Sequence, residues 1–215
     1  MSELPQQIDE RYGETLFLLL RSVPYQGSSI IVSGITPHLG QIGFFIRLPS
    51  GKGQDRFPLF DLFRLLRINY KRGKGELFYS QEAECLADHS QLSRDYKRFQ
   101  CACWLAKFSL ANTLPELPQP KYFRAMQVAL LRLSEKTQTP PAILTGVCLT
   151  FLQEAGLLDT KRLNPQELAQ CSLLLEMASG GDMPALQEEN WQQLWLWCHQ
   201  QLLENECIIP PFEQL

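Results

Sequence analysis

Five basic residues in the middle of the chain are interleaved with aromatic residues, a combination that can bind nucleic acid. The basic residues are Arg64, Arg67, Lys71, Arg72 and Lys74. The aromatic residues among and just after them are Tyr70, Phe78 and Tyr79. Cationic side chains attract phosphates, and exposed rings stack on unpaired bases. The alternative is that the rings belong to a core and the charges only face solvent, and the spacing leaves both interpretations open.

Further basic residues extend this set in both directions along the chain. Arg94, Lys97 and Arg98 are spaced i, i+3 and i+4, which places them on one face of a helix. The local charge supports the same interpretation, because residues 89–136 alone hold eight basic and three acidic residues. A basic segment within an acidic whole suggests a face that binds polyanions, although solvated helix faces would give the same composition. The residues that we expect to contact DNA are Arg47, Lys52, Arg64, Arg67, Lys71, Arg72, Lys74, Arg94, Lys97 and Arg98.

Sequence motifs for catalysis or metal binding are absent. The segments 51–53 and 73–75 both read Gly-Lys-Gly, which lacks the length and the Ser/Thr of a phosphate-binding loop and is typical of a hairpin turn. Cys101 and Cys103 are two residues apart, so on a helix they would face different ways. The three histidines stand alone in the sequence. We therefore expect a protein that is not an enzyme and that needs no cofactor and no metal.

Cysteine usage and hydropathy indicate a reducing compartment. The seven cysteines are an odd number spread thinly through apolar surroundings, which favours reduced thiols over a disulfide framework. No run of 18 apolar residues exists, so no transmembrane helix is expected. The first 14 residues are polar and acidic, unlike a secretory signal. These features predict a cytoplasmic protein.

The spacing of apolar residues changes near the middle of the chain, from a pattern typical of strands to one typical of helices. Residues 12–82 read as about five short strands with tight turns, which is typical of a small barrel or sandwich. Their apolar runs cover 16–20, 28–35, 41–48, 57–70 and 77–79. Residues 91–205 read as helices, with Ser93 as the first N-cap and Asn164-Pro165 as a later start. The predicted helices cover 94–110, 122–135, 142–155, 164–177 and 186–203.

The order of these strand and helix segments resembles that of the RecO family of bacterial recombination mediators. The matching stretches are 18–29, 35–42, 57–65 and 75–84, followed by the helix near Arg94 that carries Tyr96 and Phe99. The resemblance covers about residues 14–158. It implies an α+β fold: a five-stranded OB-fold β-barrel that binds nucleic acid (residues 1–83), followed by an all-α helical domain (residues 84–215).

The resemblance also implies a function. Members of the family bind single- and double-stranded DNA, anneal complementary strands and act with RecR to load the recombinase onto single strands coated by single-strand binding protein (SSB). A DNA repair and recombination mediator of this kind works at the bacterial nucleoid. Many members hold zinc with four cysteines just after a stretch like residues 152–158. Here no cysteine follows until Cys171, so we expect no zinc finger.

A site for the C-terminal tail of SSB is a further implication of the resemblance. That tail is acidic and ends in an apolar residue, so its receptor needs a hydrophobic slot rimmed by cations. The residues that could build the slot are Trp104, Lys107, Phe123, Arg124 and Arg132. The competing hypothesis is a protein-interaction module whose OB-like barrel has lost most DNA binding. The sparse basic loop at 48–54 favours it, as do the ten acidic and two basic residues of 137–215.

Overall fold

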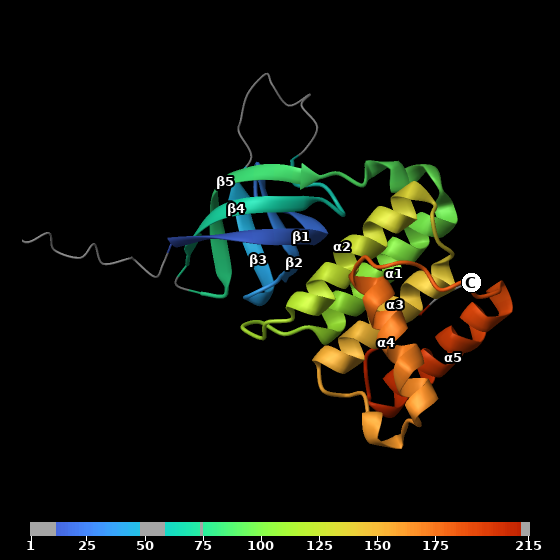
Figure 1. The fold of residues 1–215 in the computed structure, drawn as a ribbon. Helices are drawn as coiled ribbons and strands as arrows, with labels where there is room; N and C mark the ends of the chain where they lie inside the picture. Colours follow the sequence, from blue (N-terminus) through green and yellow to red (C-terminus); the bar gives the residue numbers. More distant parts are fainter. Residues whose placement is uncertain (1–11, 48–58, 74, 212–215) are drawn as a thin grey trace, which may run out of the picture.

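The N-terminal part of the protein is a closed five-stranded barrel (Figure 1). The computed structural model describes residues 12–47, 59–73 and 75–211. The strand order around the barrel is β1-β2-β3-β5-β4, and all neighbours are antiparallel except β3 and β5. This is an OB-like barrel, and the predicted fold class is confirmed. The strands are β1 (Tyr12–Tyr25), β2 (Ser29–Thr36), β3 (Gly40–Arg47), β4 (Leu65–Arg72) and β5 (Leu77–Ala87).

Strand β1 is buried on both faces over its apolar run. Successive side chains of a strand point to opposite sides. Phe17 and Leu19 point into the barrel, whereas Leu18 and Leu20 belong to the core under the helices. Because neither side meets water, this run shows no alternation of polar and apolar residues. The strand continues beyond this run, through Pro24 to Tyr25.

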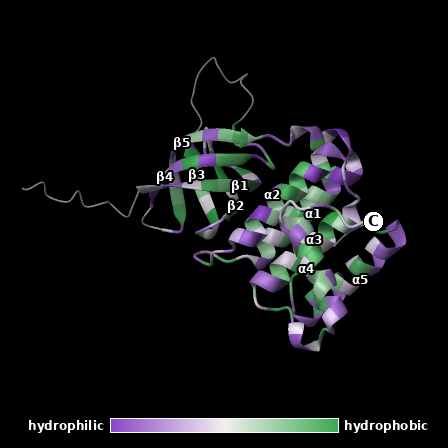
Figure 2. Ribbon diagram, viewed as in Figure 1, coloured by the Kyte–Doolittle hydropathy of each residue, from purple (hydrophilic) through white to green (hydrophobic). Residues whose placement is uncertain are grey.

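Helices make up the rest of the described chain, arranged around the central helix α3 (Figures 1 and 2). Every residue of α3 from Pro141 to Leu152 is buried, because α1, α2, α4 and α5 all pack against it or its neighbours. Asn164 caps α4 through the amides of Gln166 and Glu167, as its position before Pro165 predicted. The helices are α1 (Tyr96–Asn112), α2 (Pro120–Glu135), α3 (Pro140–Glu154), α4 (Pro165–Ser179) and α5 (Glu188–Glu204), with short 3-10 turns η1 (Ser90–Arg94) and η2 (Thr160–Arg162).

The connection between barrel and helices differs from the sequence prediction. Strand β5 runs to Ala87, so the barrel extends past the boundary placed after residue 83. Helix α1 begins after the 3-10 turn η1, and its N-cap is Asp95, which accepts a hydrogen bond from the Arg98 amide. Ser93 does not cap the helix, because its hydroxyl donates to the Ser90 carbonyl at 2.7 Å. The sequence prediction overlooked Asp95, whose carboxylate caps the helix in place of the Ser93 hydroxyl.

One of the two hydrophobic cores is shared by the barrel and the helices, whereas the other fills the inside of the barrel. Leu18, Leu20 and Phe63 of the barrel side are buried in the same cluster as the apolar residues of α1 to α5. The loop between α1 and α2 also extends the sheet at the start of β3. The Gln41 amide donates to the Leu114 carbonyl (3.1 Å), and the Glu116 amide donates to the Leu39 carbonyl (2.9 Å). The helical part therefore packs directly against the barrel, both through the shared core and through the hydrogen bonds of the α1–α2 loop.

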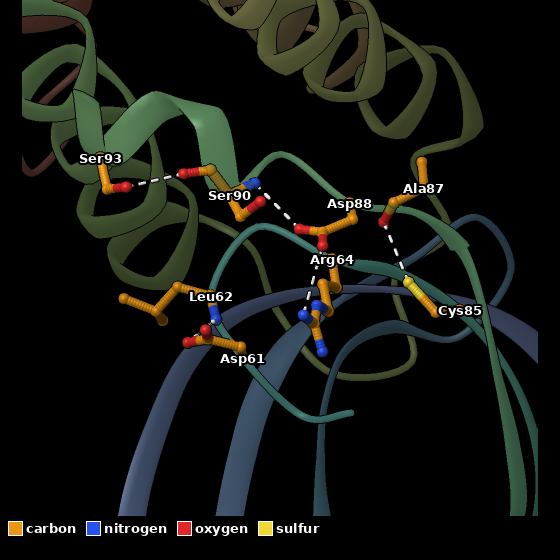
Figure 3. A network of polar contacts seen from close by, with 8 residues as sticks. All are labelled: Asp61, Leu62, Arg64, Cys85, Ala87, Asp88, Ser90 and Ser93. Carbon is orange, nitrogen blue, oxygen red and sulfur yellow. Dashed lines mark hydrogen bonds and ion pairs between the residues drawn. The ribbon is translucent and has the colours of Figure 1, made fainter. Parts of the chain in front are cut away.

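A buried arginine joins the barrel to the η1 turn (Figure 3). Arg64 is 5 % exposed, and its guanidinium pairs with the Asp88 carboxylate at 3.3 Å. Asp88 also accepts a hydrogen bond from the Ser90 amide at 2.9 Å. Burial opposes ionisation of Asp88, but the Ser90 hydrogen bond and the Arg64 charge outweigh it and lower its pKa. The pair therefore stabilises the junction as long as Asp88 is ionised.

The neighbouring His89 makes the stability of this junction depend on pH. Its ring is buried beside the Ser134 hydroxyl (3.1 Å), and burial lowers its pKa below the usual 6.5 despite the nearby charges of Asp88 and Glu135. The folded state thus favours neutral His89. Its contribution to stability is complete above pH 6.5 and is lost as the pH falls through the lowered pKa. The contribution of Asp88 is lost only at lower pH, as the pH falls from 3.8 through the lowered pKa.

We expect the free energy of unfolding to fall as the pH is lowered from 7.5 to about 5, the range in which unfolded histidine titrates. Urea unfolding followed by circular dichroism across this range measures the change. The variant His89→Gln should show a flatter dependence, whereas His38→Gln, at an exposed histidine, should follow the native protein. Equal slopes in all three proteins would contradict the assignment to His89.

The remaining sequence predictions concern the state of the cysteines and the presence of membrane-spanning helices. All seven cysteines are free thiols in the structure: four are buried, Cys103 and Cys207 are partly buried, and Cys85 is exposed. Burial raises the pKa of the Cys101 thiol to about 12, so this thiol stays protonated at neutral pH. Within the described ranges, none of the helices combines the length and the hydropathy that crossing a membrane requires.

Candidate nucleic-acid interface

Three aromatic side chains form a row on the outer face of the barrel. The ring centroids of Tyr25 and Phe45 are 6.0 Å apart, and those of Phe45 and Tyr79 are 5.9 Å apart. Both pairs are edge-to-face, and they connect strands β1, β3 and β5. Tyr25 is 45 % exposed and Tyr79 is 49 % exposed. Phe45, which lies between them, is half-buried. We call these three residues the aromatic row, and the exposed rings of Tyr25 and Tyr79 are accessible for stacking.

The strand register explains why these rings meet. Ile31 pairs with Phe45 across β2 and β3, and Phe45 pairs with Tyr79 across β3 and β5. The adjacent residues Phe44 and Phe78 are buried inside the barrel. Because side chains alternate along a strand, Phe45 and Tyr79 must point outward. Of the two consecutive phenylalanines of β3, Phe44 therefore belongs to the barrel core and Phe45 to the outer face.

Cationic side chains flank the aromatic row. Arg47 ends β3 and is exposed two residues after Phe45. Lys71 is paired with Tyr79 in the sheet, and its Nζ lies 5.2 Å from the centre of the Tyr12 ring. Arg47 makes no ion pair among the residues that the structure describes. Rings and cations on one face are the combination that holds a single-stranded polyanion.

A groove continues this face at the seam between β3 and β5. The two strands share only three residue pairs, and the α1–α2 loop lies beside the gap. Gly43 and Leu77 line the groove two residues before Phe45 and Tyr79 of the aromatic row. We call it the barrel groove, with a volume of about 700 Å³. Its lining comes from Ser33, His38, Leu39, Gln41, Ile42, Gly43, Arg72, Gly75, Glu76, Leu77, Phe78, Pro115 and Glu116.

An ion pair crosses the barrel groove. Arg72, at the end of β4, pairs with Glu116 of the α1–α2 loop. The arginine side chain is 51 % exposed, and its guanidinium carbon lies 5.6 Å from the centre of the Phe78 ring. Glu76 is a second carboxylate in the groove wall. The groove therefore contains both a phosphate-binding group and two carboxylates that oppose a polyanion.

The structure separates the predicted DNA-binding residues of the barrel into several environments. Arg47, Lys71 and Arg72 lie at the aromatic row and the barrel groove. Arg64 is in the interior with Asp88, so the prediction that it contacts DNA is corrected by its burial. Arg67 is on the surface of β4 but pairs with Glu84 at 2.9 Å. Lys52 and Lys74 lie outside the described residues.

The predicted basic face near the start of α1 is not one face. Arg94 and Lys97 are exposed, but Arg94 belongs to η1 and precedes the helix. Arg98 turns inward, where its guanidinium donates to the Gln138 carbonyl at 3.0 Å and pairs with Asp95 at 3.6 Å. The spacing rule failed because it assumes one continuous α-helix from residue 94.

The five residues predicted for an acidic tail are likewise not brought together. Phe123 is buried in the core, and Arg124 donates to the Ser179 carbonyl at 3.2 Å. Arg132 donates to the carbonyls of Met177 (2.7 Å) and Gly181 (2.6 Å). Both arginines thus satisfy carbonyl groups at the C-terminal end of α4, where cations are favourable. Their role in this structure is to fix α4.

Trp104 and Lys107 do share a cavity, which we call the α1 slot. It is about 320 Å³ and lies on the surface of α1. The indole of Trp104 donates to the Pro210 carbonyl at 2.8 Å, so the chain after α5 forms one wall. No carboxylate lines the slot in the described part of the chain. Its lining residues are Tyr96, Phe99, Gln100, Cys103, Trp104, Lys107 and Pro211.

Sequence reasoning missed the residues that define this face. Tyr25 appeared only in the stretch 18–29 between two expected strands, and Phe45, 20 positions later, only as part of an apolar strand. Among the predicted aromatics, Phe78 is buried and Tyr70 packs 5.2 Å from it, so only Tyr79 is exposed. Glu116 was missed because it is 44 positions from Arg72.

The protein is an OB-like barrel fused to a helical bundle, and the outer face of the barrel carries aromatic and cationic side chains, the types that stack on bases and pair with phosphates. Neither known protein families nor curated proteins yield a match to this chain. Among the described residues, no three His, Cys, Asp or Glu side chains are grouped so that they could hold a metal ion.

Proposed function

We propose that this protein binds single-stranded DNA on the outer face of its barrel and acts as a mediator of DNA repair and recombination. The observation that carries the proposal is the aromatic row, which exposes Tyr25 and Tyr79 on an OB-like barrel with Arg47 and Lys71 beside them. Stacking on such rings tolerates any base sequence, as a recombination mediator requires. The resemblance to the RecO family adds strand annealing, binding of duplex DNA and action at the nucleoid in the cytoplasm.

Annealing by such a surface needs no acid–base group. A cationic face raises the local concentration of two polyanions and reduces the repulsion between their phosphates. Rings that hold unpaired bases keep a strand extended until its complement arrives. The charges present here are few, because Arg67 and Arg72 are paired with carboxylates. The proposal therefore relies on stacking more than on charge.

The α1 slot supports a partner role for the helical part. Its apolar lining and Lys107 suit an acidic peptide with an apolar end, such as the tail of SSB. We propose the slot as the binding site for that tail, in place of the five-residue set expected from the sequence. RecR is a proposed partner through the family resemblance alone.

The salt dependence of binding tests the proposed surface. The double variant Arg47→Gln/Lys71→Gln should weaken binding of a fluorescent single-stranded 30-mer and reduce the slope of log K against log salt by about 1.4, since each phosphate contact contributes about 0.7 for single strands. Fluorescence anisotropy across a salt series measures both. Lys121→Gln/Lys161→Gln removes two exposed charges from the helical part and should leave the slope near that of the native protein. Equal slopes in both double variants would remove Arg47 and Lys71 from the interface.

The second candidate function is a protein-interaction module that has lost DNA binding. The paired cations Arg67 and Arg72 favour it, because their charges are already neutralised. This candidate predicts no binding of the 30-mer even at low salt, together with retained binding of RecR or of an acidic tail peptide. The same anisotropy experiment therefore distinguishes the two functions.

A further inference from the structure

The ion pair across the barrel groove is placed where a strand leaving the aromatic row would pass. Gly43 and Leu77 line the groove, and the next outward-facing residues of their strands are Phe45 and Tyr79. Row and groove are thus adjacent parts of one surface. Arg72 extends over the groove toward Glu116, so the pair lies on this path.

The pair is of a kind that exchanges partners at little cost. Its side chains are 51 % and 71 % exposed, and ion pairs this exposed contribute little to stability because water screens the two charges. A phosphate accepts two parallel hydrogen bonds from a guanidinium, as a carboxylate does. Arg72 can therefore satisfy the same donors with either group.

The α1–α2 loop does not depend on this pair for its position. The Glu116 amide donates to the Leu39 carbonyl, and Pro115 forms a bridge with Gly40. The backbone thus holds the Glu116 carboxylate close to Arg72 whether or not the ion pair is made. A carboxylate fixed in this way acts at a high local concentration against any external anion.

We infer that Glu116 is a built-in competitor for Arg72, which a bound single strand displaces by placing a phosphate on the guanidinium as it passes from the aromatic row into the barrel groove. This inference rests on the proposed function. It assigns Arg72 as a phosphate contact that is masked in the free protein. It also explains how a surface with few unpaired cations binds a polyanion, since one cation becomes available only upon binding.

The test is a double-mutant cycle on affinity for the fluorescent 30-mer. Glu116→Gln should raise the affinity about two- to fivefold, because it removes a competitor worth at most about 1 kcal/mol. Arg72→Gln should lower the affinity, and adding Glu116→Gln to it should give little further change. The two substitutions are thus expected to be strongly non-additive.

A second carboxylate of the same groove supplies the matched control. Glu76 is exposed and lines the groove without an ion pair to Arg72 among the described contacts. Glu76→Gln removes the same charge, so any gain it gives is general electrostatics and should persist in the Arg72→Gln background. If Glu116→Gln gives the same gain with and without Arg72, the competition is refuted.

The outcomes also separate this inference from the proposed function. Loss of affinity in Arg47→Gln/Lys71→Gln, with Glu116→Gln behaving like Glu76→Gln, overturns only the competition by Glu116. Absence of binding by the native protein at low salt overturns the proposed function as well. Far-ultraviolet circular dichroism of each variant checks that the barrel is intact.

Discussion

Replacing Tyr25, Phe45 and Tyr79 together by alanine is expected to lower the affinity for single-stranded DNA by about 30-fold or more. Each base stacked on an aromatic side chain contributes about 1–3 kcal/mol, and the row offers the two exposed rings of Tyr25 and Tyr79, with the half-buried Phe45 between them. The lower value, taken twice, corresponds to roughly 30-fold. Anisotropy with the 30-mer measures the loss, which should exceed that of any charge substitution on this face.

The same variant should bind duplex DNA with an affinity within about fivefold of the native value, because paired bases are not available for stacking. Tyr96→Ala is the matched control, since Tyr96 is 73 % exposed but lies on α1, away from the row. It should leave binding of the 30-mer unchanged. An equal loss for single strands and duplex would show that the row acts by shape or stability. No loss at all would place the interface elsewhere.

Gly40→Ala is expected to reduce the free energy of unfolding by about 3 kcal/mol or more. Gly40 has a φ of +66°, which costs other residues about 1–2 kcal/mol. A Cβ there would also meet the carbonyl oxygens of Leu114 and Leu117, the latter at 2.7 Å. Backbone atoms cannot move aside as a flexible side chain can. The substitution therefore forces the α1–α2 loop away from β3, and urea unfolding measures the cost.

Gly27→Ala separates the two causes. Gly27 has nearly the same φ, +65°, but nothing lies within 4 Å of the position of its Cβ. Gly27→Ala should therefore lower the free energy of unfolding only through the strained backbone conformation, by about 1–2 kcal/mol. If both substitutions destabilise the protein equally, then the contact between the loop and β3 contributes nothing. That result would also weaken the argument that the backbone holds Glu116 beside Arg72.

Several elements of the fold could be predicted from the sequence because their signals are local. The helix at α3 follows from an apolar run after two prolines, and the start of α4 follows from Asn164-Pro165. The hairpin between β4 and β5 follows from two glycines close together. Each of these signals depends on residues within about one turn, so no tertiary information is needed.

The start of α1 and the end of β5 could not be predicted in the same way. Ser93 and Asp95 are both good N-caps, and the choice depends on the η1 turn that joins the helix to the barrel. The outer residues of β5 are polar and acidic, which resembles a linker until β4 is placed beside them. Pairing between strands, and not composition, decides whether such a segment is a strand.

Local patterns were enough to predict a first half of about five short strands, as in a small barrel or sandwich, a helical second half, and Arg47, Lys71 and Arg72 as candidate DNA contacts. Which of the charged and aromatic side chains share a surface follows from the three-dimensional fold alone. It buried Arg64, turned Arg98 inward and set Glu116 against Arg72. It also joined Tyr25, Phe45 and Tyr79 into one row. The physical reason is that strand register and burial depend on contacts between distant segments, which no local pattern specifies.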